Sequence, residues 1–133
     1  MSTRFNMDEY IRIKKKDERL ILGVMSGTSL DGLDLALVKI SGTGFDIKFD
    51  LVRFASEPMP DHWRKRIQQA FDTNTREICN INFDLANYLS DRIIQFCSDA
   101  KLPLEDLDAI GCHGQTLYHG HNHSTLQTGE ADV

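Results

Sequence analysis

Glycine, hydroxyl and carboxylate residues crowd into one short segment between two apolar runs, Leu20–Val24 and Leu35–Ile40. The segment contains, in order, Gly27, Thr28, Ser29, Leu30, Asp31, Gly32, Leu33 and Asp34. Glycines let backbone N–H groups converge on an anion, and the two hydroxyls add side-chain donors. The carboxylates of Asp31 and Asp34 suit magnesium or its bound waters. The pattern predicts a β-hairpin whose tip binds phosphate, and the alternative is an ordinary hairpin with a polar loop.

This segment differs from the common nucleotide-binding loops. It has neither the Gly-x-Gly-x-x-Gly spacing of a Rossmann turn nor the lysine of a Walker A loop. A phosphate at this turn would therefore be held by backbone amides and hydroxyls.

A second polar cluster runs from Gly111 to His119. Gly111 and Gly114 would let the backbone approach a small ligand closely. The polar side chains of the cluster are His113, Gln115, Thr116 and His119. They offer donors and acceptors that suit sugar hydroxyls, an acetamido group or a carboxylate. The alternative is structural: His113 and Gln115 would merely satisfy buried backbone groups.

The histidines also raise a competing hypothesis, metal binding. Four of the five histidines fall between positions 113 and 123, with Cys112 beside them. On one extended strand, His119, His121 and His123 would point to the same side, as a Zn²⁺, Ni²⁺ or Cu²⁺ site requires. The sequence has no Cys-x-x-Cys pair of the kind found in structural zinc sites, and residues 120–124 are equally typical of a variable loop.

The strands that must position these clusters are predicted from hydrophobic spacing. Both apolar runs around the first cluster have the continuous character of strands covered on both faces. After a turn at residues 41–44, apolar and charged residues alternate, which indicates a half-buried strand. The apolar members are Phe45, Ile47, Phe49 and Leu51. The alternation changes phase at Leu51–Val52, where we expect a bulge or a strand end.

Helical spacing follows. Asp61 is a suitable N-cap for a helix that ends near Phe71 and packs inward through Trp63, Ile67, Ala70 and Phe71. A longer stripe that includes Cys97 predicts a second helix from about residue 76 to residue 101, stopped by Leu102-Pro103.

Residues 107–112 are predicted to form a buried strand after these helices. The expected fold is α/β: a three-stranded antiparallel meander, crossover helices, and a further strand parallel to the first. The two polar clusters would then share one cleft at the strand ends.

Composition sets the remaining limits. The chain has 133 residues, enough for one compact domain, with 41% hydrophobic and 26% charged residues. A net charge of −5 argues against nucleic-acid or acidic-membrane partners, and no apolar run suits a membrane span or signal peptide.

Three cysteines, Cys79, Cys97 and Cys112, are interpreted as free thiols, so we expect a cytoplasmic protein. Residues 1–18 form a polar extension, and its basic cluster at residues 12–16 is interpreted as a solvated tail.

Three segments carry a resemblance to a known family. Residues 25–34 resemble the signature of the anhydro-N-acetylmuramic acid kinases, which belong to the actin-like ATPase superfamily with the sugar kinases. Residues 111–119 resemble the family's other N-terminal hallmark, and Thr125–Gly129 resembles the segment that follows it. The resemblance covers residues 19–133, which would form a truncated N-terminal part of the kinase domain. Residues 1–18, the polar extension, lie outside it.

The resemblance implies a ribonuclease-H-like half-domain, incomplete in this chain, and ATP and Mg²⁺ as cofactors. Residues 27–34 would bind the nucleotide phosphates, with Asp31 meeting Mg²⁺ through water. His113, Gly114, Gln115, Thr116 and His119 would line the amino-sugar cleft. The implied reaction phosphorylates 1,6-anhydro-N-acetylmuramic acid and opens its anhydro ring, giving N-acetylmuramic acid 6-phosphate in cell-wall recycling.

The resemblance also implies a homodimer, and it places the general-base aspartate beyond Val133, so no catalytic residue is assigned in this chain. Two other functions stay open at this point: a non-catalytic phosphate- or partner-binding module, and a histidine-rich metal-binding domain.

Overall fold

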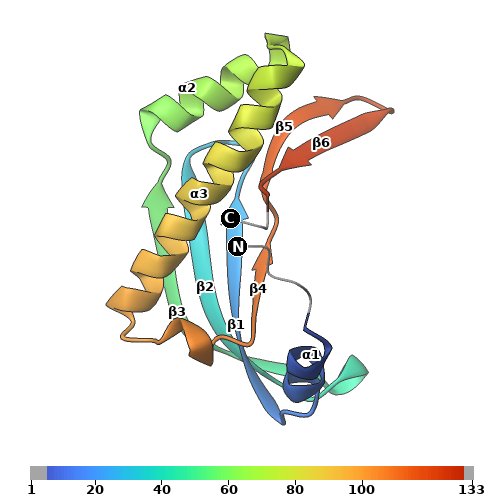
Figure 1. Ribbon diagram of the computed structural model, residues 1–133, viewed down its shortest axis with the longest axis vertical. Helices are drawn as coiled ribbons and strands as arrows, with labels where there is room; N and C mark the ends of the chain where they lie inside the picture. The colour runs from blue at the N-terminus through green and yellow to red at the C-terminus, as the bar shows by residue number, and fades with distance from the viewer. Residues whose placement is uncertain (1–5, 131–133) are drawn as a thin grey trace.

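A four-stranded mixed sheet forms the centre of the molecule (Figure 1). The computed structural model describes residues 6–130. The strands are β1 (Glu18–Ser26), β2 (Gly32–Ser41), β3 (Lys48–Pro58) and β4 (Ala109–Cys112), in the order β3-β2-β1-β4. The β1–β2 and β2–β3 pairs are antiparallel, whereas β4 is parallel to β1. The predicted meander and its additional parallel strand are both confirmed.

A β-bulge interrupts the β2–β3 pair. Leu37 lies opposite Arg53, but Val38 lies opposite Leu51, so Val52 is the extra residue. The bulge confirms the phase change expected at this position. Because of it, the odd-numbered side chains before Val52 and those after Val52 point to opposite faces of the sheet.

Two α-helices cross over from β3 to β4. They are α2 (Asp61–Gln69) and α3 (Thr75–Asp99), separated by the 3₁₀ turn η2 (Ala70–Asp72). Asn74 caps α3, because its side-chain oxygen accepts from the N–H of Glu77 at 3.0 Å. Asp61 is the first helical residue and Pro60 the N-cap, a shift of one position from the prediction. Both helices are otherwise as expected.

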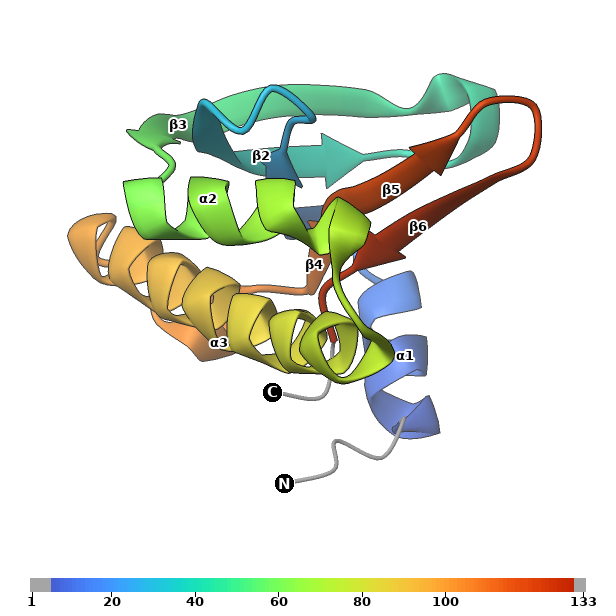
Figure 2. The same cartoon turned by 90° about the horizontal axis from the view of Figure 1, so that it is seen from above.

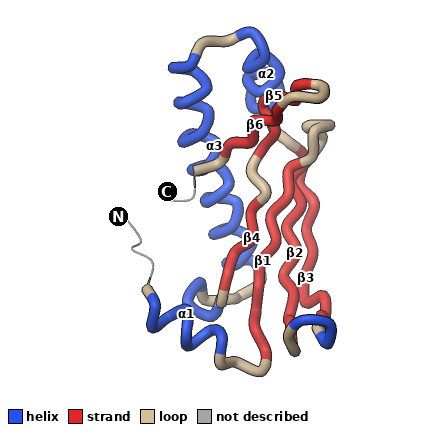
Figure 3. Tube along the Cα trace, turned by 90° about the vertical axis from the view of Figure 1, so that its right-hand side faces the viewer, coloured by secondary structure: helices blue, strands red, loops and turns tan. Residues whose placement is uncertain are grey.

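Both helices cover the same face of the sheet, and the other face is open within residues 6–130 (Figure 3). The core between the layers contains Leu22, Val24, Leu33, Leu35, Leu37, Trp63, Ile67, Ile81, Leu85 and Leu89. Phe96 and Cys97 extend it, and burial raises the pKa of the Cys97 thiol. All three cysteines are free, as predicted.

The prediction that β1 and β2 are covered on both faces is wrong for the described residues. In the half of each strand near the turn, every second residue is buried, as Leu33, Leu35 and Leu37 are in β2, while the residues between them are more exposed. The prediction that residues 107–112 form a buried strand is also wrong. Each residue of β4 is exposed because β4 lies at the edge of the sheet.

Residues 45–51, predicted to form a half-buried strand, are all exposed. The exposed fractions are 110% for Phe45, 53% for Ile47, 70% for Phe49 and 61% for Leu51. Two causes account for the error. Residues 44–46 form the 3₁₀ turn η1 (Gly44–Asp46), and in the edge strand β3 the pairing places Phe49 beside Ile40 and Leu51 beside Val38, on the face of the sheet away from the helices (Figure 2). Phe71, predicted to pack inward, is 58% exposed and instead lies against Tyr118 at 5.4 Å between ring centroids.

Three elements were not predicted. β5 (Gln115–Gly120) and β6 (Ser124–Thr128) form an antiparallel hairpin beyond the end of the main sheet. The N-terminal extension contains α1 (Met7–Lys14), and residues 1–5 lie outside the described part of the chain.

The interpretation of residues 12–16 as a solvated tail is wrong for two side chains. Lys16 forms an ion pair with Asp108, and Arg12 lies 3.9 Å from the same carboxylate. Burial alone would raise the pKa of Asp108, but the Lys16 hydrogen bond, the Leu20 N–H and the two cations leave this pKa lowered. The ion pairs hold α1 against the start of β4.

Among residues 6–130, no helix is both long and apolar enough to cross a membrane.

Candidate functional site

The first polar cluster forms the turn between β1 and β2. Ser26 and Leu33 are the last paired residues, and residues 27–31 make the turn. Its tip is exposed at Thr28, Ser29 and Asp31. The expected hairpin is therefore present, with hydroxyl and carboxylate groups on an exposed tip.

Contacts from three other parts of the chain hold this turn in place. Leu30 has a φ of 56°, an uncommon conformation for a residue with a side chain, and is only 6% exposed. Its N–H donates to Gly27 O at 3.2 Å, and its carbonyl accepts from Arg64 Nε of α2 at 3.2 Å. The N–H of Met59 donates to Asp31 O at 3.1 Å. The burial of Leu30 and these bonds compensate the backbone strain.

Gly32 is required by close approach rather than by its φ angle. A Cβ at this position would lie 2.7 Å from the carbonyl oxygen of Glu57 in β3. Glu57 is fixed in turn by Arg92 of α3, whose Nε donates to Oε2 at 2.7 Å. Because of this contact, the end of β3 packs directly against the turn.

Both carboxylates of the turn accept from serine hydroxyls. Ser29 Oγ donates to Asp31 Oδ1 at 2.7 Å, and Ser56 Oγ donates to Asp34 Oδ1 at 2.6 Å. The Ser29 hydroxyl, then backbone N–H groups and the charge of Arg64 lower the pKa of Asp31. Asp31 is therefore ionised at neutral pH. Carboxylate and hydroxyl oxygens are hard donors of the kind that Mg²⁺ prefers, so the residues present fit that ion.

A cleft of about 590 Å³ opens beside the turn. It is lined by Met25, Gly27, Ser29, Asp31, Gly32, Asp34, Ser56, Glu57 and Pro58. Ser56 and Glu57 were not predicted from the sequence, because nothing in β3 marks them as neighbours of a turn more than twenty positions earlier. Leu30 and Leu33 were predicted to bind the nucleotide, and their side chains are buried in the core. Only their main-chain groups can face a ligand.

Gln115 connects the two polar clusters. Its side chain is fully buried, and Ser26 Oγ donates to its Oε1. Its Nε2 donates to Gly27 O at 3.4 Å and to Thr116 O at 3.3 Å. Both predicted clusters therefore meet at the end of β1, and Gln115 acts there as a support for the turn. This geometry matches the structural alternative for Gln115.

His113 lies where β4 leaves the sheet. Its N–H donates to Val24 O at 3.3 Å, which continues the parallel pairing with β1. Gln127 Nε2 lies 2.7 Å from His113 Nε2, and His113 Nδ1 lies 3.4 Å from Gly114 O. Gly114 has a φ of 69°, and a Cβ there would lie 2.4 Å from Thr128 O, so this position requires glycine.

Asn82 of α3 holds the other side of this region. Its Oδ1 accepts from the N–H of Gly129 at 2.8 Å, and its carbonyl accepts from the N–H of Glu130 at 3.3 Å. A small pocket of about 260 Å³ lies here, lined by Asn82, Cys112, His113, Gly114, Gln127, Thr128, Gly129 and Glu130. Sequence reasoning missed Asn82, since one asparagine within a helix carries no signal of a contact made forty-seven positions later.

Thr116 and His119 lie on β5 and face β6 partners. Thr116 Oγ1 accepts from Gln127 Nε2 at 3.5 Å, and His119 Nδ1 lies 2.7 Å from Thr125 Oγ1. The extended strand that the metal hypothesis requires through His119, His121 and His123 is not formed, because residues 121–123 are the turn between β5 and β6, in agreement with the loop interpretation. Among residues 6–130, no three His, Cys, Asp or Glu side chains are grouped to hold a metal ion.

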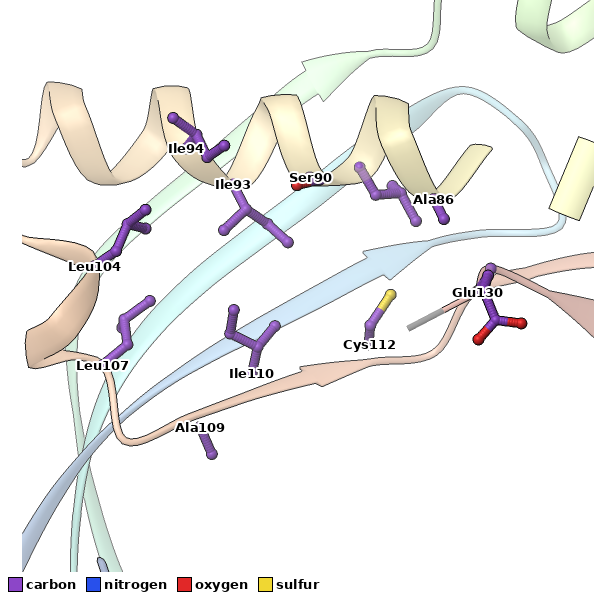
Figure 4. A pocket seen from close by; sticks show the side chains of 12 residues that line it. Ala86, Ser90, Ile93, Ile94, Leu104, Leu107, Ala109, Ile110, Cys112 and Glu130 are labelled. Carbon is purple, nitrogen blue, oxygen red and sulfur yellow. The ribbon is translucent and has the colours of Figure 1, made fainter. Parts of the chain in front are cut away.

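A separate groove of about 640 Å³ lies between α3 and β4 (Figure 4). Ile93 of α3 faces Ile110 of β4 across it, Leu104 and Leu107 lie at one end, and Cys112 and Glu130 lie at the other. Its walls are apolar along most of their length, so it does not suit a phosphate. The polar cleft beside the turn is therefore the candidate site for a phosphate.

A meander with a polar turn between β1 and β2, crossover helices and a parallel β4 defines the class of protein. It is a ribonuclease-H-like α/β half-domain, as expected from the sequence. The family model for anhydro-N-acetylmuramic acid kinase matches residues 19–133. The chain belongs to the anhydro-N-acetylmuramic acid kinase family.

Individual relatives agree with the family assignment. An anhydro-N-acetylmuramic acid kinase from Caldanaerobacter subterraneus subsp. tengcongensis is 42% identical over 139 residues, which cover 96% of this chain and 35% of the relative. Kinases of the same name from Bacillus cereus and Bacillus thuringiensis are 44% and 43% identical over 85% of this chain and 32% of their own length. The chain thus spans about a third of the length of these relatives.

Proposed function

We propose that this chain forms the phosphate-binding part of an enzyme that phosphorylates 1,6-anhydro-N-acetylmuramic acid from ATP. The reaction would open the anhydro ring and yield N-acetylmuramic acid 6-phosphate, as a step of cell-wall recycling in the cytoplasm. One observation supports this most directly: the exposed β1–β2 turn is bonded through Gln115 to the second polar cluster. Both motifs of a kinase family thereby share one end of the sheet.

The turn would neutralise and orient the transferred phosphate. Phosphoryl transfer requires charge stabilisation and alignment more than covalent help from the protein. The backbone N–H groups of the turn and the hydroxyls of Thr28 and Ser29 would donate to phosphate oxygens. Asp31, ionised at neutral pH, would hold Mg²⁺ through water, and that ion would offset the negative charge of the phosphates.

The second cluster would bind the amino sugar. His113, Thr116 and His119 carry polar groups near the turn, and Gly114 lets the backbone come close. The general base that activates the attacking water would come from the part of the enzyme that follows the matched third of the relatives. Residues 6–130 would therefore bind and align, and they would not turn over substrate alone.

A chimeric enzyme tests the proposal. Residues 19–133 replace the matching segment of the Caldanaerobacter kinase, and a coupled assay follows ADP release with the anhydro sugar. We expect turnover by the chimera, none by the 133-residue chain, and a loss of about tenfold or more for Asp31→Asn, since that carboxylate is assigned to the metal.

Asp46→Asn is the matched control, because Asp46 is an exposed carboxylate in η1, remote in the sheet from the turn. It should leave the rate unchanged. Equal rates for Asp31→Asn and the parent chimera would contradict the role of Asp31. A folded chimera without activity, beside an active parent kinase, would contradict the function.

A further inference from the structure

Helix α3 contacts both halves of the candidate site. Asn82 bonds to the chain where it leaves β6, beside the second polar cluster, and Arg92 bonds to the end of β3, beside the cleft at the β1–β2 turn. At a rise of 1.5 Å per residue, these two positions are about 15 Å apart along the helix axis. One rigid element is therefore tied to both polar clusters.

Asn82 fixes the end of β6. Its Oδ1 accepts from the N–H of Gly129 at 2.8 Å, and its carbonyl accepts from the N–H of Glu130 at 3.3 Å. Gly129 lies in turn against Gly114, since a Cβ built on Gly129 would lie 3.2 Å from the Cα of Gly114. Because the two backbones meet so closely, a shift of Gly129 would displace the loop that carries His113.

Gln127 carries the same constraint to two polar side chains of the second cluster. It lies two positions before Gly129, and its Nε2 lies 2.7 Å from His113 Nε2 and 3.5 Å from Thr116 Oγ1. Both of these groups are assigned to the amino sugar in the proposed function. Their positions therefore depend on where Asn82 holds the end of β6.

Arg92 fixes the border of the cleft beside the turn. Its Nε and Nη2 donate to the two carboxylate oxygens of Glu57 at 2.7 and 3.1 Å, which makes a bidentate, partly buried ion pair. Glu57 lines the cleft and lies opposite Leu33 of β2, and its carbonyl oxygen would lie 2.7 Å from a Cβ on Gly32. The ion pair thus ties α3 to the strand against which the turn packs.

We propose that α3 positions both halves of the active site, with Asn82 aligning the sugar cluster and Arg92 aligning the phosphate cleft. Both are positioning residues, because they act through Gly129 and Glu57. A single helix keeps the distance between its two contacts constant, and transfer of a phosphoryl group requires that the two bound substrates be held in line. This inference rests on the proposed function, which assigns one cluster to the sugar and the other to ATP.

Steady-state kinetics of the chimera with the Caldanaerobacter kinase separates the two roles. Asn82→Ala should raise the KM for the anhydro sugar by about fivefold or more and leave the KM for ATP within about twofold. Arg92→Met should do the reverse, since methionine keeps much of the apolar stem and removes the ion pair. A general loss of stability would move both constants together. Equal changes in both constants, or no change in either, would refute the proposal.

Asn87→Ala and Arg76→Met are the matched controls. Both residues are exposed on α3, and Asn87 Nδ2 donates locally to the carbonyl of Phe83 at 3.0 Å. Both controls should keep the KM values of the parent chimera. A lowered KM-type selectivity in either control, equal to that of Asn82→Ala or Arg92→Met, would contradict the specific roles of these two residues.

Amide hydrogen exchange of the 133-residue chain tests the same contacts without turnover. An inactive parent chimera would therefore count against the proposed function, while the exchange data would still decide this inference. Asn82→Ala should accelerate exchange at residues 113–116 and leave residues 32–34 unchanged, and Arg92→Met should show the opposite pattern. Acceleration at both segments in each variant, or at neither, would overturn the positioning roles.

Discussion

The molecule has two hairpin tips with similar chemistry and different support. The β1–β2 turn at residues 27–31 and the β5–β6 turn at residues 121–123 are both polar and exposed at their tips. Each includes a non-glycine residue with positive φ, Leu30 at 56° and Asn122 at 60°. From their sequences, either turn could hold a ligand, one a phosphate and the other a metal ion.

Their surroundings separate them. The β1–β2 turn has a buried leucine and hydrogen bonds from Arg64, Met59 and Gln115, which come from other parts of the chain. In the β5–β6 turn, the contacts recorded within residues 6–130 are local: His123 N–H donates to Gly120 O at 3.2 Å, and His123 Nδ1 lies 2.9 Å from Ser124 Oγ.

The comparison teaches that polar residues at a tip are not enough for a site. A binding turn must hold its donors in place before the ligand arrives, so that little ordering entropy is lost on binding. The β1–β2 turn meets this condition, whereas the β5–β6 turn does not. The predictions below test that difference.

The largest difference should appear on truncating the residue with positive φ in each turn. Leu30→Ala removes buried side-chain volume, and we expect it to lower the free energy of unfolding by about 2–4 kcal/mol. Asn122 lies on an exposed tip, so Asn122→Ala should change the free energy of unfolding by about 0.5 kcal/mol or less. Urea denaturation measures both. Similar losses for the two variants would remove the distinction between the turns.

Gln115→Ala should lower the free energy of unfolding by nearly as much. It removes one hydrogen-bond partner from the Ser26 hydroxyl and one from the Gly27 carbonyl, and we expect a loss of about 2 kcal/mol. His121→Ala, in the other turn, is the matched control and should be nearly neutral. If Gln115→Ala is as stable as the wild type, the link between the two clusters does not support the turn.

Arg64→Ala tests the contact from α2. Loss of its bonds to Leu30 O and Met59 O should lower the free energy of unfolding by about 1 kcal/mol. The amide exchange of residues 27–31 should also accelerate relative to that of β1. Lys65→Ala, the next residue in the same helix, serves as control. Unchanged exchange in the turn would show that Arg64 does not fix it.

The smallest effect is on the ionisation of Asp31. Its pKa is lowered in the folded chain, so its contribution to stability is complete above the ordinary carboxyl pKa and is lost as the pH falls through the folded-state pKa. Ser29→Ala removes the main cause and should move the pKa of Asp31 back toward its ordinary value. Side-chain carboxyl NMR titration measures this shift. An unchanged pKa would mean that the hydroxyl contact is not maintained in solution.

Much of the fold could be predicted because local spacing determines it. The stripe that includes Ile81, Leu85 and Leu89 predicted α3 to within two residues at each end, and the phase change at Val52 predicted the bulge. The β1–β2 hairpin was predicted from glycines and hydroxyls between two apolar runs. In each case the pattern lies within one element, where sequence distance and spatial distance agree.

Predictions failed where burial depended on distant elements. Alternation at residues 45–51 correctly indicated an extended chain from Lys48 onward, but residues 44–46 form η1, and the spacing could not show that Phe49 and Leu51 would lie on the face of the sheet away from the helices. The basic cluster of the N-terminal extension was interpreted as a solvated tail. Lys16 nevertheless forms an ion pair with Asp108, a buried residue ninety-two positions later. The role of Arg64 was likewise not visible, because a hydrogen bond to a backbone carbonyl leaves no periodic pattern, and for Gln115 the sequence left a structural role only as the alternative to sugar binding.

By itself, the sequence determined the elements and the chemical character of the two clusters, since glycine content, hydroxyls and hydrophobic period act over a few residues. Only the tertiary structure decided which polar turn is held rigid, which apolar strand is left exposed, and that Gln115 supports the turn from a buried position. Those outcomes depend on packing between segments far apart in the chain, where the free energy of each contact is set by what surrounds it.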